Sequence, residues 1–310
     1  MFEGILGIHH VTAISADIQR NYDFYVKLLG LRLVKKTVNF DDPGAYHLYY
    51  GDAHGTPGTI LTFFSYPGAQ KGAPGTGQAT SFALAIPEGS LSFWLDRLAN
   101  HQVKAETGCR FGEKLATIHD PDGLQVDLIE SALKDSTPWL SADIGRNHAI
   151  AGIHSVSLTL EGFDQTAKLL HERMAYRAGP HDEHRYRYDK PHPVVGSILD
   201  LVCSPYAPRG RGGAGTIHHV AFRVENDTKQ RLWRLQLDTD GYNVSPVMDR
   251  NYFHSIYFRE PGHVLFEIAT DPPGFAADEP MEKLGERLCL PEWMESHRTQ
   301  IEQVLPPLKT

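Results

Sequence analysis

The sequence predicts an α+β protein in which four βαβββ units pair into two cupped mixed sheets. A similar apolar strand pattern opens at His10, Ser81, Ser155 and His219, so it recurs at intervals of roughly 70 residues. A helical pattern and then further strand patterns follow each of these openings. Because one such unit cannot bury both its sheet face and its helix, we expect the units to pack in pairs.

The helical pattern of each unit carries apolar side chains three and four residues apart, which is typical of a helix with one buried face. Gly30 follows the first helical segment and Gly241 follows the last, and glycine is a common stop signal after a helix. The four predicted helices cover residues 17–29, 90–98, 164–174 and 227–237.

The last strand of each unit holds a polar residue among apolar neighbours at an equivalent position. Turn signals precede three of these strands, as in Pro57-Gly58 and Pro261-Gly262. The polar residues of these closing strands are Thr62, Asp127, Asp200 and Glu267.

A polar stretch over residues 132–149 separates the second unit from the third. We therefore expect an N-terminal pair of units at 1–135 and a C-terminal pair at 150–275. The remaining segment, 276–310, differs from the units and predicts a helical arm, with helices near 281–288 and 291–304. We expect this arm to pack against the units or to contact a second copy in a homo-oligomer.

Composition excludes several classes of partner. The net charge of -8 argues against nucleic acid, whose binding draws on clustered Lys and Arg. No apolar run approaches the roughly 20 residues needed to span a bilayer. Cys109, Cys203 and Cys289 form no CxxC pair, and free thiols fit a reducing cytosol. We expect a cytoplasmic protein without nucleic-acid or membrane partners.

Comparison of equivalent positions in the four units predicts a metal site. The opening and closing positions of units one and four supply His10, His219 and Glu267, whereas units two and three supply serines and aspartates. Two imidazoles and one carboxylate on one face are the ligands of non-haem Fe(II) centres with open coordination positions. Thr62 adds no fourth strong ligand, which leaves those positions free. Mn(II) accepts the same ligands and is the alternative metal.

Strand alternation makes predictions for the neighbours of these ligands. Thr12 lies two residues from His10 and should face the same side. His9 and His218 should face the opposite side, unless a twist or bulge turns them toward the pocket. Histidines in turns and polar stretches are expected at the solvated surface. These are His47, His54, His101, His119, His171, His192 and His263.

The chain resembles the vicinal-oxygen-chelate superfamily, the glyoxalase-like fold that includes glyoxalase I and extradiol dioxygenases. Within it, the segments IHHVTAI, GTILTFF, GTIHHVAFRV, DRNYF, SIYFREP and LFEIATDPPGF are similar to the hydroquinone-type ring-cleaving dioxygenases. In the common catechol enzymes the third unit supplies the first histidine, but here that position is Ser155 and the first unit supplies His10. This departure favours the hydroquinone branch.

The resemblance implies roles for further residues. Tyr257 in SIYFREP and Arg250 in DRNYF would contact the substrate, and Thr12, His9 and His218 would support the metal ligands. The implied function is an Fe(II)-dependent dioxygenase that opens hydroquinone-type, dihydroxylated aromatic rings with O2. The partners would be an aromatic diol and O2.

Two alternatives stay open at this point. A glyoxalase-type isomerase or metal-dependent thiol transferase would need a fuller ligand set, and Thr62 speaks against it. A protein that binds aromatic or quinone compounds without turnover would not need the set of His10, His219 and Glu267.

Overall fold

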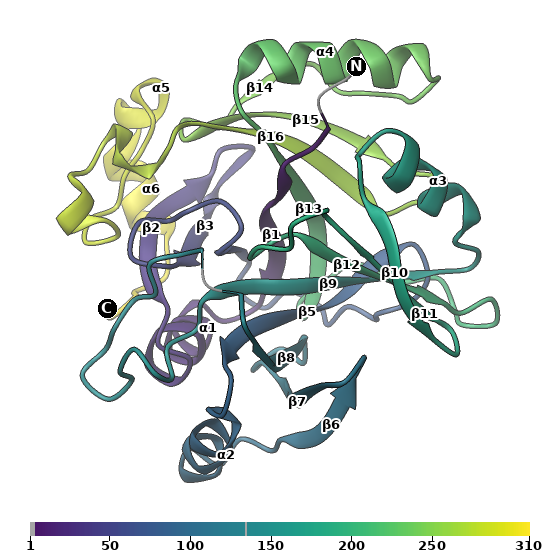
Figure 1. Ribbon diagram of the computed structural model, residues 1–310. Helices are drawn as coiled ribbons and strands as arrows, with labels where there is room; N and C mark the ends of the chain where they lie inside the picture. The colour runs from purple at the N-terminus through teal and green to yellow at the C-terminus, as the bar shows by residue number, and fades with distance from the viewer. Residues whose placement is uncertain (1–3, 134) are drawn as a thin grey trace.

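The computed structural model describes residues 4–133 and 135–310, in which the strands form two eight-stranded sheets (Figure 1). This confirms the expected fold class. The first sheet has the order β14-β15-β16-β13-β1-β4-β3-β2, and the second has the order β10-β11-β12-β9-β5-β8-β7-β6. The strands of the first sheet are β1 (Gly7–Ser15), β2 (Arg32–Asn39), β3 (Asp42–Gly51), β4 (Ile60–Ser65), β13 (Thr216–Val224), β14 (Met248–Asp249), β15 (Phe253–Arg259) and β16 (Leu265–Pro273). Those of the second are β5 (Gln78–Pro87), β6 (Glu106–Arg110), β7 (Glu113–His119), β8 (Gln125–Ser131), β9 (Gly152–Leu160), β10 (Arg177–Asp182), β11 (Arg185–Asp189) and β12 (Ile198–Cys203).

The units pair across the chain and not along it. Antiparallel pairing of β1 with β13 joins unit one to unit four, and pairing of β5 with β9 joins unit two to unit three. Each expected half, 1–135 or 150–275, thus contributes one unit to each sheet, so neither half forms a sheet by itself. The division of the chain into these domains stays a prediction.

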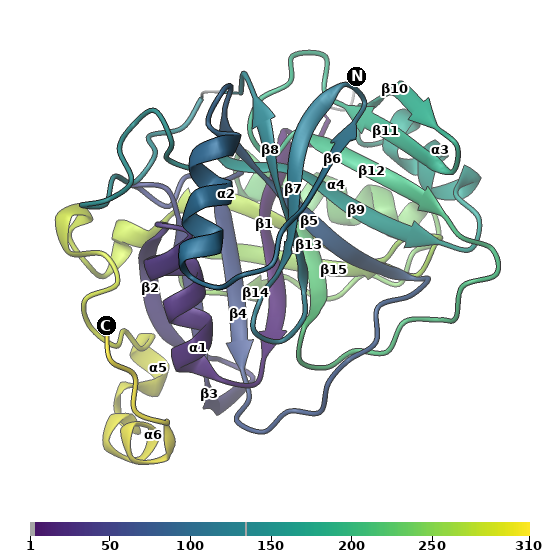
Figure 2. The ribbon, with the colours of Figure 1, turned by 90° about the horizontal axis from the view of Figure 1, so that it is seen from below.

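The helices lie where the periodicity predicts them. Asp17 caps the first helix by accepting hydrogen bonds from the backbone N–H groups of Gln19 and Arg20. Helix α2 lies beside η1, where Arg97 donates to the carbonyls of Lys27 and Leu28 (Figure 2). The bounds are α1 (Ile18–Tyr22), which continues as the π-helical η1 (Asp23–Leu28), then α2 (Leu91–Asn100), α3 (Asp164–Glu172) and α4 (Asp227–Thr239).

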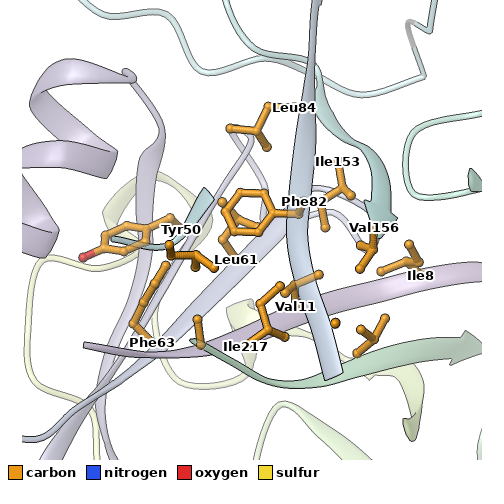
Figure 3. Close-up of a cluster of buried hydrophobic side chains, with 14 of the residues drawn as sticks. Ile8, Val11, Tyr50, Leu61, Phe63, Phe82, Leu84, Ile153, Val156 and Ile217 are labelled. Carbon is orange, nitrogen blue, oxygen red and sulfur yellow. The ribbon is translucent and has the colours of Figure 1, made fainter. Parts of the chain in front are cut away.

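A continuous apolar core lies between the two sheets (Figure 3). Strand alternation makes β1 two-sided: Val11 faces this core, while His10 and Thr12 line a pocket on the other side. The first sheet is thus anchored on one face and free to carry polar groups on the other. Labelled core residues in Figure 3 are Ile8, Val11, Tyr50, Leu61, Phe63, Phe82, Leu84, Ile153, Val156 and Ile217.

Two glycines join the sheets through their backbones. Gly196 accepts a hydrogen bond from Ile8 N–H and donates to the Ile153 carbonyl, both at 2.6 Å. Gly58 makes the equivalent bonds, donating to the His9 carbonyl at 2.9 Å and accepting from Ile153 N–H at 3.0 Å. A Cβ on Gly196, whose φ is +75°, would lie 2.7 Å from the Cα of Gly58. The crossing therefore requires both a left-handed backbone and the absence of a side chain.

The C-terminal arm packs against β2 and β3 at the edge of the first sheet (Figure 1). Its second expected helix is present as α5 (Glu292–Glu295) and α6 (Arg298–Val304), preceded by the short η2 (Phe275–Ala277) and η3 (Met281–Lys283). The expected helix over 281–288 is wrong beyond Lys283, because the chain turns at Gly285 and lays Leu288 against Lys36 of β2. None of the helices in the described part of the chain has both the length and the apolar character that a transmembrane span requires.

The glycine crossing predicts an unequal response to alanine. Gly196→Ala should lower the free energy of unfolding by roughly 3 kcal/mol, because the left-handed conformation costs about 1–2 kcal/mol and overpacking adds about 1–3 kcal/mol. Gly241→Ala is the matched control: its φ is +88°, but nothing lies within 4 Å of the added Cβ. It should cost about 1 kcal/mol. Chemical denaturation measures both, and equal losses would contradict the close approach.

Candidate metal centre

His10, His219 and Glu267 come together on the pocket face of the first sheet. The Nε2 atoms of the two histidines lie 3.3 Å apart. Glu267 Oε2 lies 3.5 Å from His10 Nε2 and 2.8 Å from His219 Nε2. Strands β1, β13 and β16, which are neighbours in the sheet, supply the three side chains. His10 and His219, which are 209 positions apart in sequence, thus face one point.

The equivalent positions predicted from the repeat correspond in the sheet registers. Thr62 pairs with Thr12, two residues beyond His10, and Glu267 pairs with Ala221, two residues beyond His219. In the second sheet Asp127 and Asp200 occupy the matching registers.

Each candidate histidine ligand is preceded by a histidine that the strand register skips. The β1–β13 pairing passes from Ile8 to His10 on one strand and from His219 to Ile217 on the other, so His9 and His218 are bulged residues. The structure thus meets the exception that the alternation argument allowed, although neither side chain lines the pocket of the three ligands. A bulge breaks the alternation and lets both imidazoles reach their neighbours.

The bulged histidines hydrogen-bond the candidate ligands. His9 Nδ1 lies 2.9 Å from His10 Nδ1, and His218 Nδ1 lies 2.8 Å from His219 Nδ1. A histidine that binds metal through Nε2 carries its proton on Nδ1, and that N–H donates to an acceptor. His9 and His218 stand at the acceptor positions. They would hold the tautomer and ring orientation in which both Nε2 lone pairs face Glu267.

Glu267 is a fully buried carboxylate. Ser255 donates a hydrogen bond to its Oε1, while Oε2 has no hydrogen-bond donor of suitable geometry within the described residues. Burial by itself would raise the pKa of Glu267, but the two imidazoles hold that pKa well below its usual range. The side chain is therefore an anion, and its unpartnered oxygen faces both histidines.

This arrangement fits a metal ion. With bonds of about 2.1 Å, ligand atoms in adjacent positions of a metal lie about 3 Å apart. The observed separations of 2.8, 3.3 and 3.5 Å match that spacing. An ion bonded to both Nε2 atoms and to Oε2 would satisfy the unpartnered carboxylate oxygen. Burying an anionic oxygen without such a partner costs several kcal/mol.

A small pocket of about 30 Å³ lies against the three candidate ligands. Aromatic side chains from separate strands and loops form much of its wall, and Asn39 adds an amide. The other lining residues are Thr12, Phe40, His47, Tyr49, Phe64, Arg250, Phe253 and Tyr257. Thr12 thus faces the same side as His10, as the alternation predicts.

Arg250 and Tyr257 lie together in this pocket. Arg250 Nε donates to the Tyr257 hydroxyl at 3.2 Å, and its Nη2 lies 3.0 Å from Asp41 Oδ2. Burial raises the pKa of Tyr257, and the charge of Glu267 raises it further. The tyrosine is therefore a neutral phenol beside a fixed cation.

His47 was expected at the surface, and that expectation is wrong. It is buried in β3, where its ring packs between Tyr49 and Phe64 and hydrogen-bonds Thr62. Its sequence context, Tyr46-His47-Leu48-Tyr49-Tyr50, is apolar and would have indicated a buried strand. The other histidines in that group are exposed, as expected: His54, His101, His119, His171, His192 and His263.

The two aspartates at the equivalent positions of the second sheet form ion pairs with arginines. Arg110 lies 2.7 Å from Asp127, and Arg187 lies 3.0 Å from Asp200. Guanidinium groups thus neutralise the two buried aspartates. Ser155, which corresponds to His219, hydrogen-bonds His154 at 3.1 Å.

A second acidic cluster, Asp278, Glu279 and Cys289, also groups possible ligand atoms. Its centre is taken by the buried ammonium of Lys35, which lies 2.5 Å from each carboxylate. The lysine supplies the positive charge there, so the cluster ties the C-terminal arm to β2.

Comparisons with known proteins agree with this fold and site. A family model described as Glyoxalase/Bleomycin resistance protein/Dioxygenase superfamily matches residues 7–128. The chain is 46% identical over 311 residues to "Putative ring-cleaving dioxygenase MhqO" of Bacillus subtilis (strain 168), covering 100% of this chain and 98% of the relative. It is 33% identical over 307 residues to chlorohydroquinone/hydroquinone 1,2-dioxygenase of Sphingobium indicum, covering 96% and 95%. The chain belongs to the glyoxalase/bleomycin resistance protein/dioxygenase superfamily and shares its family with these dioxygenases.

Solved structures give the same result for the fold. One crystal structure, of a "putative dioxygenase from Bacillus subtilis subsp. subtilis str. 168", superposes with a TM-score of 0.96 at 45% identity. The superposition covers 99% of this chain and 98% of that one. Glyoxalase I from Zea mays superposes with a TM-score of 0.65 at 16% identity, covering 86% and 92%. The second likeness concerns the fold alone.

The geometry predicts the effect of removing a candidate ligand. Wild-type protein should bind one Fe(II) or Co(II) per chain, and His10→Ala, His219→Ala or Glu267→Gln should each weaken that binding about 100-fold or more, because one of three protein bonds is lost. Anaerobic titration followed by metal analysis measures this. Ser155→Ala, at the equivalent position of unit three, is the control and should bind metal normally. If one of the ligand variants kept the full metal affinity, the substituted residue would not be a metal ligand.

Proposed function

We propose that this protein is an Fe(II)-dependent dioxygenase that opens hydroquinone-type aromatic rings with O2. The convergence of His10, His219 and Glu267 beside a pocket that also holds Arg250 and Tyr257 carries this proposal. Two histidines and one carboxylate with open positions are typical of non-haem Fe(II) oxygenases. The relatives named as ring-cleaving dioxygenases, one of them a hydroquinone 1,2-dioxygenase, support the reaction class.

Fe(II) bound by the three ligands would supply a Lewis acid that favours the ionised phenol and a redox centre between the ring and O2. The chain's own residues orient the ring. Phe40, Phe64 and Phe253 form apolar walls around the three ligands, which keeps water from the reacting centre. Phe253 also packs on the His10 ring, with centroids 5.1 Å apart.

Tyr257 and Arg250 are placed to contact the ring's second oxygen. Tyr257 pairs with Glu267 across β15 and β16, so its side chain lies on the same face as that ligand. A neutral phenol can donate a hydrogen bond to a hydroxyl or carbonyl oxygen, and the adjacent guanidinium stabilises negative charge that develops there. Arg250 thereby contributes a fixed positive charge without a proton transfer of its own.

Thr62 supports an oxygenase over a glyoxalase-type isomerase. It lies at the closing position of unit one, where a fourth protein ligand would stand. Its hydroxyl is fully buried and hydrogen-bonds Thr12 and His47. A metal held by His10, His219 and Glu267 would therefore meet no protein anion on the side toward Thr62.

The reaction is tested by its dependence on O2. A hydroquinone should be consumed only in the presence of O2, and the ring-opened acid should retain both atoms of one ¹⁸O2 molecule, apart from exchange with water. Hydroquinones should be turned over faster than matched catechols. Ring cleavage under strict anaerobiosis would refute the oxygenase class, and a strong preference for catechols would refute the substrate class alone.

The role of Tyr257 is tested by removing its hydroxyl. Tyr257→Phe should lower kcat about 100-fold while metal content stays at the wild-type value, since the hydroxyl contacts substrate and not metal. Steady-state kinetics with metal analysis measures both. Tyr242→Phe is the matched control, because that half-buried tyrosine packs on Phe258 outside the pocket and should keep wild-type kinetics. Unchanged kcat in Tyr257→Phe would contradict the assignment.

A further inference from the structure

A chain of buried hydrogen bonds crosses three strands and ends at the candidate metal centre. The Tyr49 hydroxyl lies 2.9 Å from His47 Nδ1, and His47 Nε2 lies 2.7 Å from Thr62 Oγ1. Thr62 Oγ1 lies 2.9 Å from Thr12 Oγ1. The four side chains are at most 9% exposed. They form one connected polar path from β3 through β4 to β1.

The sheet register sets this path. Tyr49 pairs with Thr62 between β3 and β4, and Thr62 pairs with Thr12 between β4 and β1. The three residues therefore project from the same face in adjacent strands. His47, two residues before Tyr49 on β3, lies on that face and bridges Tyr49 to Thr62. Thr12 then presents the end of the path beside His10.

The direction of the path follows from the two ring nitrogens of His47. Burial lowers the pKa of His47 well below its usual value, so the ring is neutral, with one donor and one acceptor nitrogen. Burial also raises the pKa of Tyr49, so that side chain is a protonated phenol. A neutral imidazole between two hydroxyl groups donates to one of them and accepts from the other. All hydrogen bonds of the path therefore run in one of two directions.

The donor strength of the end groups selects the direction. A phenol is a better donor than acceptor, because its oxygen lone pair is delocalised into the ring, and the unprotonated imidazole nitrogen is a strong acceptor. Either direction leaves one terminal hydroxyl, that of Thr12 or that of Tyr49, without a protein acceptor among the described residues, so that count does not distinguish the two. The phenol therefore favours the direction in which Tyr49 donates to Nδ1 and His47 Nε2–H donates to Thr62.

We propose that Tyr49 and His47 are positioning residues that hold the Thr12 hydroxyl as a hydrogen-bond donor into the pocket, toward an oxygen atom of the aromatic ligand. Thr62 donates to Thr12 Oγ1, which leaves the Thr12 O–H as the one proton of the path without a protein acceptor among the described residues. Thr12 lines the pocket beside His10, so this donor would face a ligand bound there.

This inference rests on the proposed function for the identity of the ligand. A fixed donor at Thr12 favours an ionised phenol oxygen, which accepts hydrogen bonds and has no proton to give. It disfavours a group that must itself donate there. Tyr49 and His47 would thus contribute to selection of a phenolate without touching it.

The first experiment reads the tautomer of His47 directly. In ¹⁵N- and ¹³C-resolved NMR spectra of the Zn(II)-loaded protein, His47 should carry its proton on Nε2. Tyr49→Phe removes the donor to Nδ1 and should shift the Nδ1 resonance and mix the tautomers. Tyr50→Phe is the matched control: Tyr50 lies next on β3, faces the core and bonds Asn21, so the His47 resonances should not change. A proton on Nδ1 in the wild-type protein would overturn the proposed direction.

The second experiment measures ligand binding without turnover. Under anaerobic conditions, Thr12→Val should weaken the binding of hydroquinone to the Fe(II)-loaded protein about 10- to 100-fold, the range of a hydrogen bond to a charged group. Thr12→Ser should restore most of that loss. Tyr49→Phe should weaken binding several-fold and Tyr50→Phe should not. Unchanged binding in both Thr12→Val and Tyr49→Phe would overturn the role of the path.

The two experiments separate this inference from the proposed function. An Nε2–H tautomer with the predicted binding losses, in a protein that does not cleave rings, would support the path and refute the dioxygenase assignment. Ring cleavage by a protein whose His47 carries the proton on Nδ1 would support the dioxygenase assignment and refute the proposed direction of the path.

Discussion

The antiparallel pairing of β1 with β13 is the constraint on which the site depends. It brings His10 and His219, from the first and last units, to 3.3 Å between their Nε2 atoms. Both strands carry a bulge, at His9 and at His218, so each candidate ligand gains a neighbouring imidazole as a hydrogen-bond partner. A regular ladder would have turned those two rings to the other face. The same bulges therefore place the candidate ligands and would hold the tautomers that metal binding needs.

Charge at the equivalent buried positions is balanced differently in the two sheets. In the second sheet, Arg110 and Arg187 neutralise Asp127 and Asp200. In the first, Glu267 faces two imidazoles and keeps one oxygen without a hydrogen-bond donor among the described residues. A buried carboxylate needs a partner of opposite charge, and a metal ion would supply it where no arginine is present. One fold thus gives a closed, salt-bridged site and an open site suited to chemistry.

The pocket is assembled from segments that are distant in sequence. Arg250 and Tyr257 come from the fourth unit, whereas His47 and Tyr49 come from the first. The β1–β13 pairing places both sets around the same three ligands. The wall from the fourth unit supplies a cation and a phenol, and the wall from the first supplies the hydrogen-bond path that ends at Thr12. In the proposed function, a flat ring would lie between these two walls.

The sequence by itself determined the unit, its helices and the three candidate ligands, because the repeat allows one unit to be compared with another. His10, His219 and Glu267 differ from serine and aspartate at the same positions. The hypothesis of one site from units one and four required those units to meet, but the sequence did not give the strand order that joins them in one sheet, since strand order is a long-range property. The alternation argument left His9 and His218 undecided between the two faces, because a bulge is visible only in the strand register. Sequence reasoning placed His47 at the surface although the apolar residues around it indicated a buried strand. The partners Phe64 and Thr62, which come from the adjacent strand β4, are visible only in the tertiary structure. Local periodicity reports which face a residue occupies, and only the tertiary structure decides what that face meets.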